Sequence, residues 1–210
     1  RPIGGWVLCQ ADCVVAVSDW EREQLREDFD VASNVVSNGI EVERFRKAKP
    51  YSHERPYLLT VGRLEKYKGV QHVVRALANL PEYDLLVAGS GPYREELERI
   101  SSSVGVDSRV VFLGYVDEEE LPSLYSGADV YVTMSAFESF GITVGEALAA
   151  GTPAVVRNSG ALADWGQRND CIAVSTGSVK SGVQRIAGTA APHENLSGWN
   201  DVVDRVVDCY

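Results

Sequence analysis

The sequence predicts an α/β protein built on a doubly wound parallel sheet, and two observations carry that prediction. Short apolar runs alternate with helical patterns along almost all of the 210 residues. Most of these runs are rich in Val and are apolar at consecutive positions, as in strands buried on both faces of a parallel sheet. Strand, helix and strand in repetition form right-handed βαβ units, which wind such a sheet in both directions.

The expected elements follow one another in regular order. Ser18 with Glu21 and Asp117 with Glu120 both match a capping box, in which each side chain satisfies a free amide of the first helical turn. Apolar residues at helical spacing predict helices over 70–80, 121–125 and 199–207. The expected strands are 13–17, 35–36, 57–61, 84–88, 110–113, 129–133, 153–156 and 171–174.

Two stretches interrupt this alternation. Residues 37–53 contain Asn38-Gly39, a basic cluster and Pro50, and no clean period runs through them. Such a composition favours a linker or a domain edge. Residues 177–195 are rich in small residues and form the second break.

The charge balance argues against one class of partner. The chain has 20 Lys and Arg against 30 Asp and Glu, for a formal net charge of −10. Nucleic-acid binding depends mainly on Lys and Arg at phosphates, so no nucleic-acid partner is expected. An acidic surface with few Lys also supports the hypothesis of a halophilic source, which predicts that added KCl stabilises the protein.

The first residue of the chain and its cysteines indicate whether the chain is a fragment and in which compartment it works. Because the first residue is Arg1 and the only Met is Met134, we expect a truncated piece of a longer protein. A membrane-spanning helix needs about 18 consecutive apolar residues, and every apolar run in this sequence is much shorter. The cysteines form no CxxC pair and have no metal-ligand spacing, so we expect no metal site, and buried reduced thiols in a cytoplasmic protein. They are Cys9, Cys13, Cys171 and Cys209.

The first glycine-marked turn follows the expected strand 57–61. Gly62 and Arg63 come directly after this strand, and Lys68-Gly69 opens the next helix. Ligands of open α/β sheets collect at the carboxyl ends of strands, where a helix N-terminus also offers free amides to an anion. Arg63 and Lys68 are therefore candidate phosphate ligands. Taken singly, each of them is explained more simply as an ordinary solvated surface cation.

A second turn, 89–92, follows the expected strand 84–88. Gly89 and Gly91 permit close approach of the backbone, either to a ligand or within a tight structural turn. The pattern is not the G-x-G-x-x-G dinucleotide fingerprint, and no P-loop motif is present. NAD-dependent enzymes and P-loop NTPases are accordingly disfavoured.

The third turn is the most informative. Glu138 and Glu146 have seven residues between them, and Phe140, Gly141 and Ile142 stand where a helix would begin. Glu146 falls on an otherwise apolar helix, and a buried carboxylate needs a polar partner such as the hydroxyls of a sugar or ribose. The alternative is an exposed Glu on an amphipathic helix.

An ordered set of motifs resembles the group 1 (family 4) retaining glycosyltransferases. The main ones are 138–146 with the following Ala-Leu-Ala-Ala-Gly-Thr-Pro, Val61-Gly62-Arg63-Leu64 and Lys68-Gly69. Each is weak alone, but the set occurs in the family's order and covers nearly the whole chain. Supporting matches are Ser37-Asn38-Gly39-Ile40 with Phe45, Gly89-Ser90-Gly91-Pro92, Val111-Phe112-Leu113-Gly114 and Ala128-Asp129-Val130.

The resemblance implies a GT-B architecture, in which two Rossmann-like domains face a cleft and the C-terminal one binds a UDP- or GDP-sugar. Arg63 and Lys68 would hold the donor diphosphate and stabilise the leaving group without a required metal or other cofactor. Glu146 would bind the ribose and Glu138 the transferred sugar, with Arg63, Lys68 and Glu138 as the catalytic set. The two carboxylates are not read as a glycosidase-type acid and nucleophile pair. The implied donor-binding residues are Gly62, Arg63, Lys68, Gly89, Gly91, Val116, Glu138, Phe140, Gly141, Ile142 and Glu146.

The chain departs from the family's pattern in two places. Within 157–164 it has one glycine where the family has a pair, and Asp164 stands where a Glu is expected, which leaves the donor sugar open. The segment 9–29 resembles the last strand and helix of the family's N-terminal domain, and the acceptor site belongs to the part before it. We therefore expect a remnant of that domain in 1–37, a linker in 38–56 and the donor-binding domain with a C-terminal helix in 57–210.

The resulting hypothesis is a retaining hexosyltransferase, of which this chain supplies the donor half and is nearly inactive alone. The acceptor would be a polysaccharide, a lipid-linked sugar or a small molecule, with peripheral membrane association through the N-terminal domain. The alternative is a non-enzymatic module that binds nucleotide sugars or mediates interactions. A GT-B epimerase or phosphorylase is a third interpretation.

Overall fold

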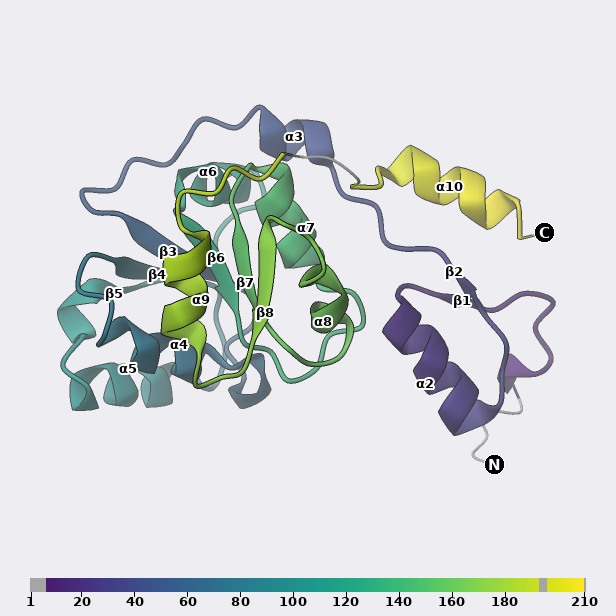
Figure 1. Ribbon diagram of the computed structural model, residues 1–210, viewed down its shortest axis with the longest axis horizontal. Coiled ribbons are helices and arrows are strands. Elements are labelled where there is room, and N and C mark those ends of the chain that lie inside the picture. Colours follow the sequence, from purple (N-terminus) through teal and green to yellow (C-terminus); the bar gives the residue numbers. More distant parts are fainter. Residues whose placement is uncertain (1–6, 193–195, 210) are drawn as a thin grey trace.

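The computed structural model describes residues 7–192 and 196–209, and its largest part is a six-stranded parallel sheet (Figure 1). The strands are β3 (Tyr57–Val61), β4 (Asp84–Ala88), β5 (Val110–Gly114), β6 (Val130–Thr133), β7 (Ala154–Arg157) and β8 (Cys171–Val174). They lie in the order β5-β4-β3-β6-β7-β8. Counted from β3, this is the 3-2-1-4-5-6 order of a Rossmann-like sheet, with its switch point between β3 and β6. The predicted doubly wound sheet is confirmed.

Helices cover both faces of the sheet, and alternate strand residues point to opposite layers. Leu58 and Leu85 belong to one apolar core, whereas Leu59 and Leu86 belong to the other. Each strand is therefore buried on both sides, which explains its continuous apolar run. The first core contains α4 (Val70–Leu77), α5 (Arg94–Ser103) and α9 (Val179–Ile186). The second contains α3 (Val42–Arg46), α6 (Leu121–Gly127), α7 (Ile142–Ala149) and α8 (Ala161–Trp165).

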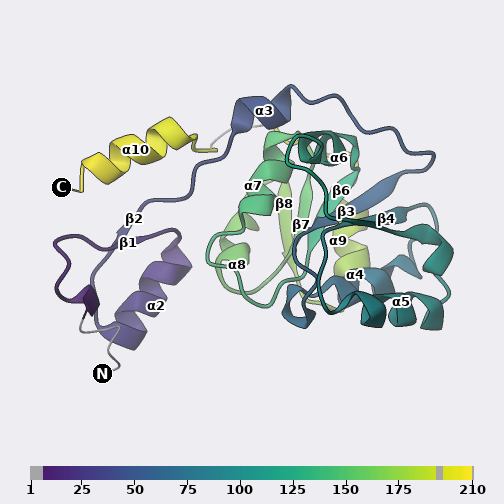
Figure 2. The same ribbon diagram turned by 180° about the vertical axis from the view of Figure 1, so that it is seen from behind.

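The first elements of the described chain and its last helix lie on one side of the large sheet, away from it (Figures 1 and 2). A short parallel pair of strands, joined through α2, forms the N-terminal part, and the last helix lies next to it. These elements are β1 (Val15–Ala16), α2 (Asp19–Phe29), β2 (Asn34–Val35) and α10 (Trp199–Val207).

The first predicted cap is confirmed at the start of α2. The Glu21 amide donates to Ser18 Oγ at 3.1 Å, and Glu21 Oε2 accepts from the Val17 amide at 2.8 Å. The returning carboxylate thus reaches the amide one residue before the cap. All eight expected strands are also present, with ends that differ by a few residues.

The second predicted cap, Asp117 with Glu120, is wrong. Helix α6 begins at Leu121, its N-cap is Glu120, and no side chain caps it. Pro122 lies in its first turn, where the missing N–H of proline costs nothing and its fixed φ favours a helix start. The proline, and not the carboxylates before it, marks this helix.

Both predicted breaks contain a helix that periodicity missed. Residues 37–53 include α3, whose Phe45 is buried with its ring 5.6 Å from that of Tyr125 on α6. Residues 177–195 include α9, which buries Val183 between small and polar neighbours. A helix of five residues is too short to show a period, and the Ser and Gly residues of α9 dilute its pattern. Within 177–195, residues 193–195 lie outside the described part.

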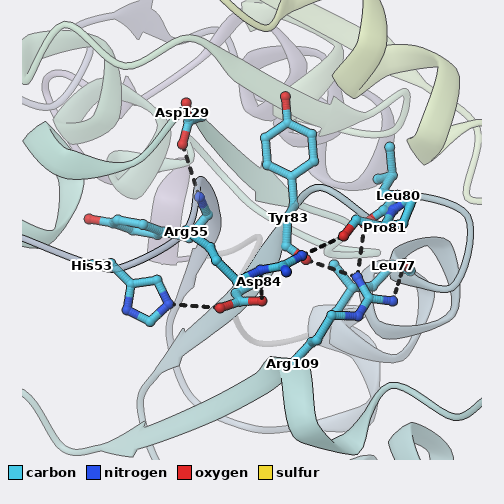
Figure 3. Close-up of polar contacts among 10 residues, drawn as sticks. His53, Arg55, Leu77, Leu80, Pro81, Tyr83, Asp84, Arg109 and Asp129 are labelled. Carbon is cyan, nitrogen blue, oxygen red and sulfur yellow. Dashed lines mark hydrogen bonds and ion pairs between the residues drawn. The ribbon is translucent and has the colours of Figure 1, made fainter.

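Buried charge is neutralised at the amino edge of the sheet, where the strands begin (Figure 3). Asp84, only 8% exposed, has His53 Nε2 at 2.9 Å and Arg55 Nε at 3.0 Å. The Arg109 guanidinium donates three hydrogen bonds of 2.9 Å to main-chain carbonyls, those of Leu77, Leu80 and Tyr83. This cluster fixes the segment before β3 and the turn before β4 to the sheet.

The cysteines differ from the expectation of buried thiols. Within the described residues Cys171 is buried, and burial, followed by the charge of Asp170, raises its pKa to about 12. Cys9 is exposed, and Cys13 and Cys209 are half-buried. In the same part of the chain, no helix combines the length and the apolar character needed to cross a membrane.

Candidate functional site: a cleft at the carboxyl edge

Three adjoining cavities lie at the carboxyl edge of the large sheet, around its switch point. A central cavity of about 110 Å³ lies between the turn after β3 and the start of α7. A β4-side cavity of about 460 Å³ shares Gly62 and Arg63 with it, and an α7-side cavity of about 530 Å³ shares Lys68 and Glu138. We call the three together the carboxyl-edge cleft.

The cleft brings together most of the predicted site residues, which lie far apart in the sequence. Glu146 is the exception, because it is not among the residues that line the three cavities. The residues that do line the cleft are Gly62, Arg63, Lys68, Gly89, Gly91, Val116, Glu138, Phe140, Gly141 and Ile142.

Lys68 and Glu138 form an ion pair across the central cavity. Lys68 Nζ lies 2.6 Å from Glu138 Oε1, and the two side chains are 24% and 22% exposed. Gly69 makes this approach feasible, because its φ is +75° and a Cβ there would lie 2.0 Å from the carbonyl oxygen of Met134. The turn that carries Lys68 thereby contacts the segment that leads to Glu138. The sequence pattern did not predict this pairing.

Arg63 is the open cation of the cleft. Its side chain is 71% exposed, and its Nε lies 3.1 Å from Glu65 Oε1. Exposed pairs of this kind contribute little to stability, so the guanidinium can leave Glu65 at small cost. The central and β4-side cavities both include Arg63, which lets one side chain serve both.

The second glycine turn is structural and also lines the cleft. Gly89 has a φ of +134°, and a Cβ there would lie 1.9 Å from the carbonyl oxygen of Gly62. A Cβ at Gly91 would lie 2.4 Å from the carbonyl oxygen of Leu64. Side chains at these positions would therefore separate the turns after β3 and β4, which form the floor of the β4-side cavity.

Helix α7 begins at the cleft. Gly141 is its N-cap, with a φ of +86°, and Ile142 is its first residue. The carbonyl oxygen of Phe140 accepts a hydrogen bond of 2.6 Å from Trp165 Nε1, which fixes the approach to the helix. The first turn of a helix leaves its amides without helical acceptors and carries partial positive charge. The cleft therefore combines two cations with a helix N-terminus.

Glu146 has a protein partner. The Tyr125 hydroxyl donates to its Oε2 at 2.9 Å. Burial raises the pKa of Glu146, while this hydrogen bond and the charge of Arg44 oppose the rise. The carboxylate is thus half-buried, as its apolar neighbours indicated, and one of its oxygens is satisfied within the protein. Its proposed contact with a ribose stays a prediction.

Sequence reasoning missed several polar and aromatic residues of the cleft. Thr133 and Thr143 line the central cavity, and Thr143 Oγ1 accepts a hydrogen bond of 2.8 Å from the buried Tyr131 hydroxyl. Tyr115, which is 77% exposed, lines the β4-side cavity, and Tyr67 the α7-side cavity. The signal for Thr133 was present, because a hydroxyl residue ends an apolar strand at the carboxyl edge.

Asp164, which departs from the family's pattern, lies in a different cavity. This cavity of about 210 Å³ lies between α8 and the N-terminal part of the chain, with Val17 and Ser18 in its wall. Burial raises the pKa of Asp164. In the described part of the chain, no group of three or more His, Cys, Asp or Glu side chains is placed to hold a metal ion.

Known proteins share both sequence and architecture with this chain. A GDP-mannose-dependent alpha-(1-6)-phosphatidylinositol monomannoside mannosyltransferase of Mycolicibacterium smegmatis is 31% identical over 90% of this chain and 59% of its own length. Sucrose-phosphate synthase of Thermosynechococcus elongatus matches with a TM-score of 0.87 and 26% identity, over 99% of this chain and 59% of that one. Anabaena HepE, solved with UDP and glucose, has a TM-score of 0.83 at 17% identity, over 94% and 62%, which shows a common fold.

The matches cover part of each curated relative and most of this chain. It spans about half the length of the curated relatives it matches, between 43% and 59% for three of them. The family model described as glycosyl transferases group 1 matches residues 41–187, which include every strand of the large sheet and all lining residues of the carboxyl-edge cleft except Asn38. The chain belongs to the group 1 glycosyl transferases.

Proposed function

We propose that the carboxyl-edge cleft binds a nucleotide-diphosphate sugar, and that the chain is the donor half of a retaining hexosyltransferase. The observation that carries the proposal is the convergence of Arg63, Lys68 and the α7 N-terminus on one cavity. Each cation pairs with one carboxylate, Arg63 with Glu65 and Lys68 with Glu138, and keeps further N–H donors. Together with the helix N-terminus, these are the hydrogen-bond donors that a diphosphate requires.

The three cavities match the three parts of such a donor. The diphosphate would lie in the central cavity, between Arg63 and Lys68. The base would occupy the β4-side cavity, whose wall includes the exposed ring of Tyr115 and the backbone near Val116. The sugar would occupy the α7-side cavity, where the carboxylate of Glu138 can accept hydrogen bonds from its hydroxyls.

The Lys68–Glu138 pair has a direct consequence for catalysis. As the bond between sugar and diphosphate breaks, negative charge develops on the diphosphate, and Arg63 and Lys68 would stabilise it. Since Glu138 already holds Lys68 at 2.6 Å, the ammonium is fixed in place before the donor arrives. Its three donors allow Lys68 to keep Glu138 and bind phosphate at once.

The choice of base and sugar in the proposed donor rests only on the names of similar proteins. One relative is named for GDP-mannose and one solved structure contains UDP and glucose, which supports a UDP- or GDP-hexose. Glu146 would bind the ribose through the oxygen that does not accept from Tyr125. The acceptor would be bound by the part of the enzyme that this chain does not span.

Calorimetric titration with UDP, GDP, ADP and the corresponding sugar nucleotides tests the proposal. We expect saturable binding of either the uridine or the guanosine compounds, and loss of affinity in Arg63→Ala and Lys68→Ala. Arg99→Ala is the matched control, because Arg99 on α5 also pairs with a neighbouring glutamate, Glu96, outside the cleft. No binding of any compound, or equal loss in the control, would refute the proposal.

A further inference from the structure

Two cysteines from opposite ends of the chain meet at the small N-terminal sheet. Cys13 precedes β1, and Cys209 follows α10. The side-chain amide of Asn34 on β2 donates to both sulfurs, with Nδ2 at 3.6 Å from Cys13 Sγ and 3.6 Å from Cys209 Sγ. Because both sulfurs lie 3.6 Å from the same nitrogen, Asn34 Nδ2, the distance between the two sulfurs is at most twice 3.6 Å.

We propose that Cys13 and Cys209 are the site of a disulfide bond that fastens helix α10 to the N-terminal β1–β2 pair. Both thiols line one open cavity of about 420 Å³. The neighbouring Asn34 side chain is exposed, so a small oxidant can reach them. Burial, and next the neighbouring Cys13 thiol, raise the pKa of Cys209.

Helix α10 has little else to hold its end. None of its residues is buried, and Trp199, Val203 and Val207 are 51%, 57% and 65% exposed. Its start is attached to the segment before α3, because the Ile40 amide donates to the Ser197 carbonyl at 2.9 Å. A bond at Cys209 would fix the other end, so that α10 would span from this segment to β1.

The chemistry needs an external oxidant, for which a small-molecule disulfide such as oxidised glutathione suffices. One thiol of the pair loses its proton, and its sulfur attacks the oxidant, whose S–S bond breaks and releases one reduced thiol. The second cysteine, also deprotonated, then attacks the mixed disulfide and releases the other thiol. Two protein thiols are oxidised, and one disulfide is reduced to two thiols.

Cys9 provides an internal control. It lines the same cavity and is exposed, but no contact joins it to Asn34 among the described residues. If simple crowding in the cavity governed oxidation, Cys9 would pair as readily as the other two. The shared contact with Asn34 instead selects Cys13 and Cys209.

The test is to oxidise the purified chain with oxidised glutathione and to map its disulfides by mass spectrometry. Cleavage before Asp12 and Asp208 separates Cys9, Cys13 and Cys209 into different peptides. We expect a linked pair of the peptides 12–18 and 208–210, lighter by two hydrogens than the two free peptides together. It should disappear on reduction and in Cys13→Ser and Cys209→Ser, and it should persist in Cys9→Ser.

Oxidation should also raise the melting temperature of Cys9→Ser, and reduction should reverse that shift. The double variant Cys9→Ser with Cys13→Ala should show no change in melting temperature on oxidation. Circular dichroism checks that this variant is folded. Links through Cys9 in comparable yield, linkage only between chains, or glutathione adducts without the linked peptide would each overturn the proposal.

Discussion

Charged side chains at the two edges of the six-stranded sheet differ in how many protein partners they have. At the amino edge, His53 and Arg55 lie against Asp84, and the guanidinium of Arg109 donates hydrogen bonds to three main-chain carbonyls (Figure 3). At the carboxyl edge, Arg63 is mostly exposed and Lys68 has one carboxylate partner. The Arg109 guanidinium is held by several main-chain carbonyls and supports the fold, whereas Arg63 and Lys68 each pair with one carboxylate and line a cavity, which leaves donors for a ligand.

The loops at the two edges of the sheet also differ in what they contact. The amino-edge contacts attach chain segments to each other, so their loss should affect unfolding. The carboxyl-edge turns contact each other through glycines and leave cavities above them. Substitutions at the two edges should therefore affect different measurements.

The largest effect is expected at the amino edge. Arg109→Ala removes three hydrogen bonds and leaves three carbonyls without their donor, which should lower the free energy of unfolding by about 3 kcal/mol. Chemical denaturation measures this loss. Nucleotide affinity should stay unchanged, and Arg99→Ala should change the free energy of unfolding by less than about 0.5 kcal/mol. An Arg109→Ala protein of full stability would remove the contrast between the edges.

Substitution of the carboxyl-edge cations should have the reverse pattern. Arg63→Ala and Lys68→Ala should each weaken binding of the donor diphosphate by about 1.5–3 kcal/mol, or about 10- to 150-fold in Kd. Arg63→Ala should leave the unfolding curve unchanged because its pair with Glu65 is exposed. Unaltered affinity in both variants would show that these cations are ordinary surface groups.

The two glutamates should differ by a smaller amount. Glu146→Gln should weaken binding of the nucleoside diphosphate by about 1 kcal/mol. Glu138→Gln should weaken the sugar nucleotide relative to the nucleoside diphosphate, since its carboxylate lines the α7-side cavity. Titration of each variant with both compounds distinguishes the two cases, and the opposite order would mean that their roles are exchanged.

The smallest effect is a dependence on pH. The pKa of Glu146 is raised above its ordinary value of 4.5 in the folded protein, mainly by burial. The folded state thus binds the proton more tightly than the unfolded state, so stability falls as pH rises from 4.5 through the raised pKa. Glu146→Gln should lack this component of the decline in melting temperature. A variant that follows the wild-type profile would show that this carboxylate does not titrate as expected.

Sequence reasoning predicted the fold well because the sheet is buried on both faces. Continuous Val-rich runs such as 57–61 indicate such strands without reference to their neighbours. Helix α3 was missed because five residues show no period, and the start of α6 was misplaced because Pro122 outweighs the Asp117 spacing.

The candidate site could be predicted only in part. Gly62, Arg63 and Lys68 follow a strand, and a parallel sheet brings the ends of its strands to one edge. Contacts between distant side chains have no local signal. The Lys68–Glu138 pair and the Tyr125–Glu146 hydrogen bond depend on the packing of segments that are distant in the sequence, and so do the positions of Cys13 and Cys209.

Amide chemical-shift mapping during titration with UDP and GDP tests the central claim most directly, because it compares the two edges in one experiment. We expect the nucleotide that binds to shift the amide signals of Gly62, Gly89 and Ile142 and to leave those of Asp84 and Arg109 unchanged. Shifts concentrated at the amino edge, or spread evenly over both edges, would contradict it.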